Sequence, residues 1–237
     1  MSRVTVAESA GFCFGVDRAV KMVYGELEKN TKVATLGPII HNQDVVNDMQ
    51  AKGARIISSV DELSDDETVV IRSHGVGRDV YDQIAAKGNR MLDATCPFVS
   101  RIHKIVAEKS AEGYFILIAG DALHPEVQGI VGHCDENCLV FKDNFELKDF
   151  FEKKYKKLEK KLAIVAQTTY NIVVWDECLN VIPKNDSDIV IFDTICNATD
   201  TRQSDAAELA KGSDIMLVVG GRHSSNTVKL FEVCSRY

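Results

Sequence analysis

Short apolar runs alternate along this chain with longer stretches in which apolar residues recur every three or four positions. The short runs predict β-strands, and the longer stretches, such as residues 16–28 and 44–51, predict amphipathic helices. Strands separated by helices are typical of parallel β-α-β units. The pattern therefore predicts an α/β fold with mainly parallel sheets. The predicted strands are residues 4–7, 33–36, 55–57, 69–72, 90–94, 115–119, 139–141, 162–166, 189–192 and 215–219.

Composition limits the classes of protein to consider. The 237 residues, 45% hydrophobic and 27% charged, can bury a core and form one large or two to three small domains. A net charge of −7 argues against a general nucleic-acid surface. We expect no membrane partner, because no apolar run approaches about 20 residues and the start lacks signal-peptide features. Seven cysteines without the spacing of a disulfide scaffold predict reduced thiols and agree with a cytoplasmic location. We also expect a monomer, because the sequence has no heptads and no long exposed apolar stretch.

Three of the cysteines share one local pattern, in which each follows a predicted strand and precedes a predicted helix. They are Cys13, Cys96 and Cys196, which are 83 and 100 residues apart, so one falls in each third of the chain. Pro97 suits the first position of a helix, where its missing N–H costs nothing. A thiol at a helix N-terminus is expected to have a lowered pKa and to be a good metal ligand or nucleophile.

Four interpretations of these cysteines remain open at this point. They could be ordinary buried thiols, or one could be a nucleophile, although nothing selects one of them. A zinc site could instead use His133, Cys134 and Cys138, but this spacing lacks a second ligand pair. Three converging thiolates suit an iron–sulfur cluster best, and three ligands for four irons would leave one iron open to a substrate.

Polar side chains also follow several predicted strands. In open parallel sheets, ligands bind beyond the carboxyl ends of the strands, so we expect these side chains to gather there. A lone serine before a helix is often only an N-cap, yet recurrence after several strands favours a shared site. Hydroxyls, imidazoles and helix N-termini can bind a phosphate without lysines. The residues are His41, His74, His124, Glu126, Thr168, Thr169, Ser224, Ser225 and Asn226.

Eight motifs, in order along nearly the whole chain, resemble those of the 4-hydroxy-3-methylbut-2-enyl diphosphate reductase family, also called LytB. They are G-F-C-F-G-V, L-G-P-I-I-H-N, R-S-H-G-V, D-A-T-C-P-F-V, H-P-E-V-Q-G, A-Q-T-T, T-I-C-N-A-T-D-T-R-Q and V-V-G-G-R-H-S-S-N-T. The resemblance implies three α/β lobes arranged with pseudo-threefold symmetry around a 4Fe-4S cluster. It also implies reductive removal of the substrate's allylic hydroxyl, the last step of the non-mevalonate isoprenoid pathway, which gives isopentenyl and dimethylallyl diphosphate.

The resemblance also implies roles for particular residues. Cys13, Cys96 and Cys196 match the cluster ligands, and the open iron would bind the substrate hydroxyl as a Lewis acid. Glu126 matches the proton-delivering carboxylate, and Thr168 matches the hydroxyl that orients the substrate and relays the proton. The pKa of Glu126 could be lowered by a helix start or raised by a closed pocket. The diphosphate-binding set is His41, His74, His124, Ser224, Ser225 and Asn226. Ferredoxin or flavodoxin is the implied electron donor.

We expect lobes at residues 1–95, 96–195 and 196–237, with the third incomplete at its C-terminus because the family continues with a further strand, helix and phosphate-binding serine. Two alternatives use the same cysteines. Quinolinate synthase also has three lobes with one cluster cysteine each, and a non-catalytic iron–sulfur redox sensor would need no Glu126. The H-P-E-V and S-S-N motifs favour the reductase.

Overall fold

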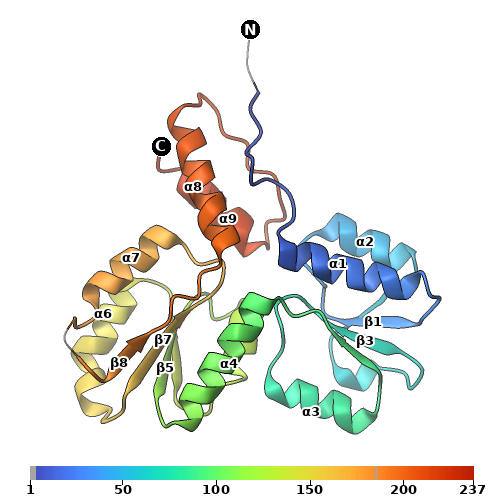
Figure 1. Ribbon diagram of the computed structural model, residues 1–237, viewed down its shortest axis with the longest axis horizontal. Helices are drawn as coiled ribbons and strands as arrows, with labels where there is room; N and C mark the ends of the chain where they lie inside the picture. The colour runs from blue at the N-terminus through green and yellow to red at the C-terminus, as the bar shows by residue number, and fades with distance from the viewer. Residues whose placement is uncertain (1–3, 185) are drawn as a thin grey trace.

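The computed structural model describes residues 4–184 and 186–237, and two separate four-stranded parallel sheets organise most of it (Figure 1). The first sheet has the order β2-β1-β3-β4, and the second has the matching order β6-β5-β7-β8. The strands are β1 (Val33–Leu36), β2 (Arg55–Ile57), β3 (Thr68–Ile71), β4 (Met91–Asp93), β5 (Phe115–Ala119), β6 (Cys138–Phe141), β7 (Leu162–Ala166) and β8 (Ile189–Ile191). The predicted α/β class with parallel sheets is confirmed.

Helices connect successive strands and cover both faces of each sheet (Figure 1). They are α1 (Phe14–Leu27), α2 (Gln43–Ala51), α3 (Arg78–Lys87), α4 (Pro97–Ala111), α5 (Pro125–Val131), α6 (Asn144–Lys153), α7 (Ile172–Val181), α8 (Asn197–Lys211) and α9 (Ser225–Cys234), with short 3-10 helices at Val60–Glu62 and Tyr155–Lys157. None of the helices in the described ranges combines the length and apolar character that crossing a bilayer requires.

The central strands are buried on both faces, which explains why they read as continuous apolar runs rather than as alternating ones. On one face of the first sheet, Val70 packs with Ala19 and Val23 of α1. On the other face, Ile71 packs with Ile84 of α3. Burying each large aliphatic side chain stabilises the fold by roughly 1.5–3 kcal/mol. The carboxyl ends of the strands are thereby held at fixed positions.

The third part of the chain consists of α8 and α9, which pack against each other. Two predicted strands are wrong, one at the start of the first expected lobe and one in the third. Residues 4–7 and 215–219 are not strands, and Ile215, Leu217 and Val219 are 79%, 85% and 93% exposed. A strand is stable only when a neighbour satisfies its backbone N–H and C=O groups. Within the described residues, neither segment is paired with a strand of the two sheets. A β-type composition alone is therefore not sufficient to make these segments strands.

Candidate active site

A cavity of about 300 Å³ lies where the strand ends of both sheets meet the segments before α1, α8 and α9. All the predicted site residues line it, including those from turns more than 180 residues apart. They are Cys13, His41, His74, Cys96, His124, Glu126, Thr168, Thr169, Cys196, Ser224, Ser225 and Asn226. The expectation that these side chains gather at one place is therefore met by the geometry.

Each of the three cysteines is the N-cap residue of a helix, Cys13 of α1, Cys96 of α4 and Cys196 of α8. Pro97 occupies the first turn of α4, as the sequence predicts. All three are free thiols, and each is partly buried. The three helices therefore direct their N-termini, and with them the three thiols, toward one cavity.

The pKa of Cys96 differs from our expectation. Burial raises it, whereas the backbone N–H groups of Phe98 and Val99 at the start of α4 act to lower it. The neighbouring thiols of Cys13 and Cys196 raise it further, because a second negative charge nearby would repel the first. The prediction of a lowered pKa is wrong for Cys96, since the loss of hydration outweighs the effect of the helix start.

The three thiols fit an iron–sulfur cluster by their chemistry and by the space around them. Thiolates are the usual protein ligands of such clusters, and these three thiols line a single cavity. Gly15 makes the close approach of α1 possible, because a Cβ on this residue would lie 2.5 Å from Cys96 Sγ. Thr199 Oγ1 lies 3.1 Å from Cys196 Sγ and supplies a polar neighbour for that sulfur.

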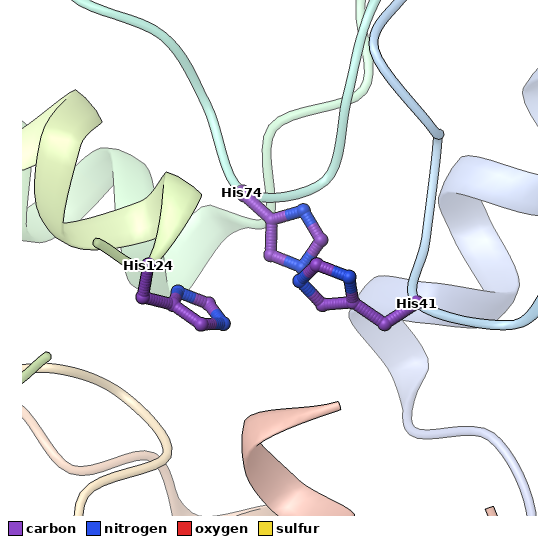
Figure 2. Close-up of side chains that lie close together, drawn as sticks. All are labelled: His41, His74 and His124. Atoms are coloured by element: carbon purple, nitrogen blue, oxygen red, sulfur yellow. The ribbon is translucent and has the colours of Figure 1, made fainter. Parts of the chain in front are cut away.

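Three histidines converge on a second part of the cavity (Figure 2). His41, His74 and His124 follow β1, β3 and β5, and their ring centroids lie 4.3 to 5.5 Å apart. One buried ring nitrogen of each lacks a hydrogen-bond partner among the described residues. Burial lowers the pKa of all three, to about 4 for His124, so the rings are neutral at pH 7. Such unpaired nitrogens favour a ligand that can hydrogen-bond to them.

Arg72 helps to decide which ligand these histidines would hold. One nitrogen of each ring lies within 4.8 Å of the others, a grouping that could also hold a metal ion. However, the positive charge of Arg72 is near enough to lower the pKa of all three histidines. A bound cation would be repelled by Arg72, whereas an anion would be attracted. Sequence reasoning missed Arg72, although it stands two residues before His74 in R-S-H-G.

The tautomer of His124 follows from its role at the start of α5. Its Nδ1 accepts a hydrogen bond of 3.1 Å from the backbone N–H of Glu126. A neutral imidazole with an accepting Nδ1 carries its proton on Nε2. The Nε2–H is the group without a partner, so His124 offers one donor to the cavity.

Glu126 is a carboxyl group that burial keeps partly protonated. Its side chain is 2% exposed, and burial raises its pKa to about 7 despite the opposing hydrogen bonds from Thr168. Thr168 donates its backbone N–H to Oε1 at 2.6 Å, and its Oγ1 lies 2.9 Å from Oε2. Because Oε1 accepts the hydrogen bond from the backbone N–H of Thr168, the proton of the neutral carboxylic acid is on Oε2. The direction of this shift, which the sequence left open, is upward.

The N-terminus of α9 closes the cavity on the side of the third part. Ser224 caps the helix by accepting the N–H of Thr227 at 3.3 Å. Ser225 Oγ accepts hydrogen bonds from Thr169 Oγ1 at 2.8 Å and from Gln167 Nε2 at 3.3 Å. These contacts join the turn after β7 to α9. Gln167 was also missed, although it follows β7 directly in A-Q-T-T.

A sequence model of the LytB protein family matches residues 4–237. The chain belongs to the LytB protein family. It is 44% identical over 238 residues to a 4-hydroxy-3-methylbut-2-enyl diphosphate reductase of Thermoanaerobacter sp. (strain X514), covering 99% of this chain and 81% of the relative. A reductase of the same name from Clostridioides difficile (strain 630) is 42% identical over 233 residues, covering 98% of this chain and 82% of that one.

Solved structures with related names resemble this LytB protein. The reductase of Plasmodium falciparum superposes with a TM-score of 0.88 at 27% identity, covering 95% of this chain and 71% of that chain. A second structure is described as the terminal enzyme of the non-mevalonate pathway, with a TM-score of 0.73, 38% identity and coverage of 98% and 82%. These matches favour the LytB interpretation over the quinolinate synthase alternative.

The zinc-site alternative receives no support in this LytB protein. His133 Nε2 hydrogen-bonds the backbone carbonyl of Val76 at 3.1 Å, and its ring stacks on His103 at 4.2 Å. Cys134 Sγ donates instead to the backbone carbonyl of Ile130 at 3.5 Å. Of the residues whose positions are described, only the three cavity histidines form a metal-sized group.

Proposed function

We propose that this LytB protein reduces (E)-4-hydroxy-3-methylbut-2-enyl diphosphate to isopentenyl and dimethylallyl diphosphate, the last step of the non-mevalonate isoprenoid pathway. The observation that carries the proposal is one cavity that combines three free thiols, three neutral histidines and a buried, protonatable Glu126. The reaction breaks the allylic C–O bond, consumes two electrons and two protons, and releases water. Relatives that bear the reductase name support it.

The thiols of Cys13, Cys96 and Cys196 would hold a 4Fe-4S cluster with one iron open to the substrate. When bound, the cluster supplies the electrons and a Lewis acid for the hydroxyl oxygen. The protein contributes the three helix N-termini at which the thiols stand and the cavity that all three line. Seven free cysteines agree with a reducing, cytoplasmic location.

The histidines would bind the diphosphate. His124 donates its Nε2–H, and the unpaired nitrogens of His41 and His74 offer two further positions. Ser225 and Asn226 lie in the first turn of α9, where free N–H groups and the helix dipole favour an anion. Binding would supply the hydrogen-bond partners that the buried histidine nitrogens lack, while Arg72 balances the negative charge. Ser224 completes the set as the cap of α9.

Glu126 and Thr168 would deliver a proton to the leaving hydroxyl. The acid proton sits on Oε2, within hydrogen-bond distance of Thr168 Oγ1, which can pass a proton onward while accepting one. A pKa of about 7 leaves a useful fraction of Glu126 protonated at neutral pH. Thr168 holds the carboxyl in place through its backbone N–H at the same time.

The remaining expectations stay part of this proposal. We infer that residues 1–95, 96–195 and 196–237 act as three lobes, that ferredoxin or flavodoxin supplies the electrons, and that the protein works as a monomer. The common edge where the two sheets and α9 meet agrees with three lobes around one centre (Figure 1).

Anaerobic reconstitution with iron and sulfide, followed by turnover of the allylic diphosphate with a reduced viologen, tests the proposal. We expect the wild-type chain to bind a cluster and release both products. Glu126→Gln should keep the cluster absorption and lose turnover. Glu26→Gln is the matched control, because Glu26 is also buried but contacts Arg90 and Lys29, and none of these three residues lines the cavity. A loaded wild-type protein without turnover, or an active Glu126→Gln, would contradict the proposal.

A further inference from the structure

Two arginines connect the cysteine turns to one another. Arg18 lies on α1, five residues after Cys13, and reaches across to the turn before Cys96. Its Nη1 donates to the backbone carbonyl of Thr95 at 3.1 Å, and its Nη2 donates to that of Asp93 at 3.2 Å. The helix that begins at one cysteine is therefore attached to the turn that presents the next.

Arg202 repeats this relation between a different pair of turns. It lies on α8, six residues after Cys196, and it reaches the segment before Cys13. Its Nε donates to the carbonyl of Ser9 at 3.1 Å, and its Nη2 donates to that of Gly11 at 2.5 Å. Asp205, one turn further along α8, accepts the N–H of Ser9 at 3.1 Å.

These contacts matter because the segment before Cys13 has little other support. Residues 4–12 form no strand, and most of them are exposed. In the described part of the chain, this segment makes hydrogen bonds to distant residues only through Arg202 and Asp205. The position of the Cys13 thiol is therefore set from both sides, by Arg202 before the residue and by Arg18 after it.

We propose that Arg18 and Arg202 are positioning residues that hold Cys13 at the correct distance from Cys96 and from Cys196, respectively. The inference rests on the proposed cluster site, whose three ligands it would align. Arginine suits this task because its planar guanidinium presents several donors in a fixed fork, which can bind two carbonyls of one turn. Lysine has a single flexible ammonium group and would fix a turn less firmly.

The two arginines predict a selective pattern, because each one links a different pair of thiols. Loss of Arg18 should loosen Cys13 relative to Cys96 and leave its distance to Cys196 unchanged. Loss of Arg202 should have the opposite result. An arginine that merely stabilised the fold would affect both pairs equally. The pattern therefore separates positioning from general stability.

The first measurement uses dibromobimane on the reduced, metal-free chain, with linked peptides quantified by mass spectrometry. Each of two thiolates displaces one bromide, so two C–S bonds form and two bromide ions leave. Arg18→Gln is expected to lower the Cys13–Cys96 product about tenfold and to spare Cys13–Cys196, and Arg202→Gln to do the reverse. The matching Lys variants should give intermediate yields. They also carry the test if a Gln variant fails to fold by circular dichroism.

Matched controls come from the same two helices. Lys21 on α1 and Lys211 on α8 are exposed. Lys21 pairs with Asp17, and Lys211 pairs with Glu208 and lies over the ring of Tyr237, so neither is bound to a cysteine turn in the described part of the chain. Lys21→Gln and Lys211→Gln should leave both product yields unchanged. Equal yields of both products in all variants, or an equal loss of both products in each arginine variant, would overturn the assignment.

The second measurement uses the anaerobically reconstituted chain and follows the release of iron to a ferrous chelator. Both arginine variants are expected to release iron about tenfold faster than the wild type and the lysine controls. A wild-type rate in both variants would count against the positioning role. If the wild-type chain takes up no iron, the proposed cluster fails, while the pattern of linked peptides still decides the role of the arginines.

Discussion

Replacing Glu126 by Gln is expected to remove a strong pH dependence from the free energy of unfolding. Burial raises the pKa of Glu126 from 4.5 to about 7, so the folded chain keeps a proton that the unfolded chain has already released. The stability that this proton contributes is complete below pH 4.5 and is lost as the pH rises through about 7. Gln cannot ionise, and it can still make both hydrogen bonds to Thr168.

The magnitude follows from the size of the pKa shift. Each unit by which the pKa of Glu126 differs between the folded and the unfolded chain corresponds to about 1.4 kcal/mol. The full contribution of this proton to the free energy of unfolding is therefore about 3 kcal/mol. Between pH 5 and pH 8, roughly 2.5 kcal/mol of it is lost from the wild type. The stability of Glu126→Gln relative to wild type should therefore rise by that amount over this range.

Urea unfolding of the two metal-free proteins at pH 5, 6, 7 and 8, followed by circular dichroism, measures this difference. Comparing the two proteins cancels the contribution of the buried histidines, whose lowered pKa values produce a slope of opposite sign. Glu26→Gln is the control, because hydrogen bonds from Arg90 and then Lys29 lower the pKa of Glu26 to about 2. The difference in the free energy of unfolding between Glu26→Gln and the wild type should be nearly constant from pH 5 to pH 8. If the corresponding difference for Glu126→Gln is also independent of pH, the pKa of Glu126 is not raised.

Three further substitutions test the thiol and histidine parts of the cavity. Gly15→Ala places a Cβ 2.5 Å from Cys96 Sγ and should reduce the iron bound per chain after reconstitution, whereas Gly25→Ala on the same helix meets no neighbour and should bind iron normally. Cys96→Ser should abolish the cluster absorption while the urea midpoint of the metal-free chain changes little; a normal absorption spectrum would exclude Cys96 as a ligand. His124→Gln should weaken the binding of inorganic pyrophosphate about tenfold by calorimetry, since one donor is lost from the site. Unchanged affinity would remove His124 from the anion site.

Most strands of the two sheets could be predicted because their burial leaves a direct mark on the sequence. A strand such as β5 is enclosed by helices on both faces, so each of its positions must be apolar. The gathering of His41 and His74 was equally predictable, since the carboxyl ends of neighbouring parallel strands share one edge.

Other features depend on partners that no local pattern identifies. The apolar run at residues 215–219 has strand-like composition, but it needs a neighbour to pair with. The pKa of Cys96 results from a competition between burial and the start of α4, and its direction requires the packed structure. The contacts of Arg202 join residues 191 and 193 positions apart, and nothing near Arg202 in the sequence indicates their destination.

The contact between Ser9 and Asp205 has a consequence for the order in which the molecule assembles. It closes a loop of 196 residues, whereas Val33 and Thr68 in the first sheet are only 35 residues apart. Closing the longer loop costs about 1.5 kcal/mol more chain entropy. The sheets can thus form from nearby segments before the two ends of the chain meet. The turns that line the cavity are therefore brought together by contacts between residues far apart in the sequence. A ligand that binds to several of these turns at once offsets the chain entropy that is lost when the long loop closes.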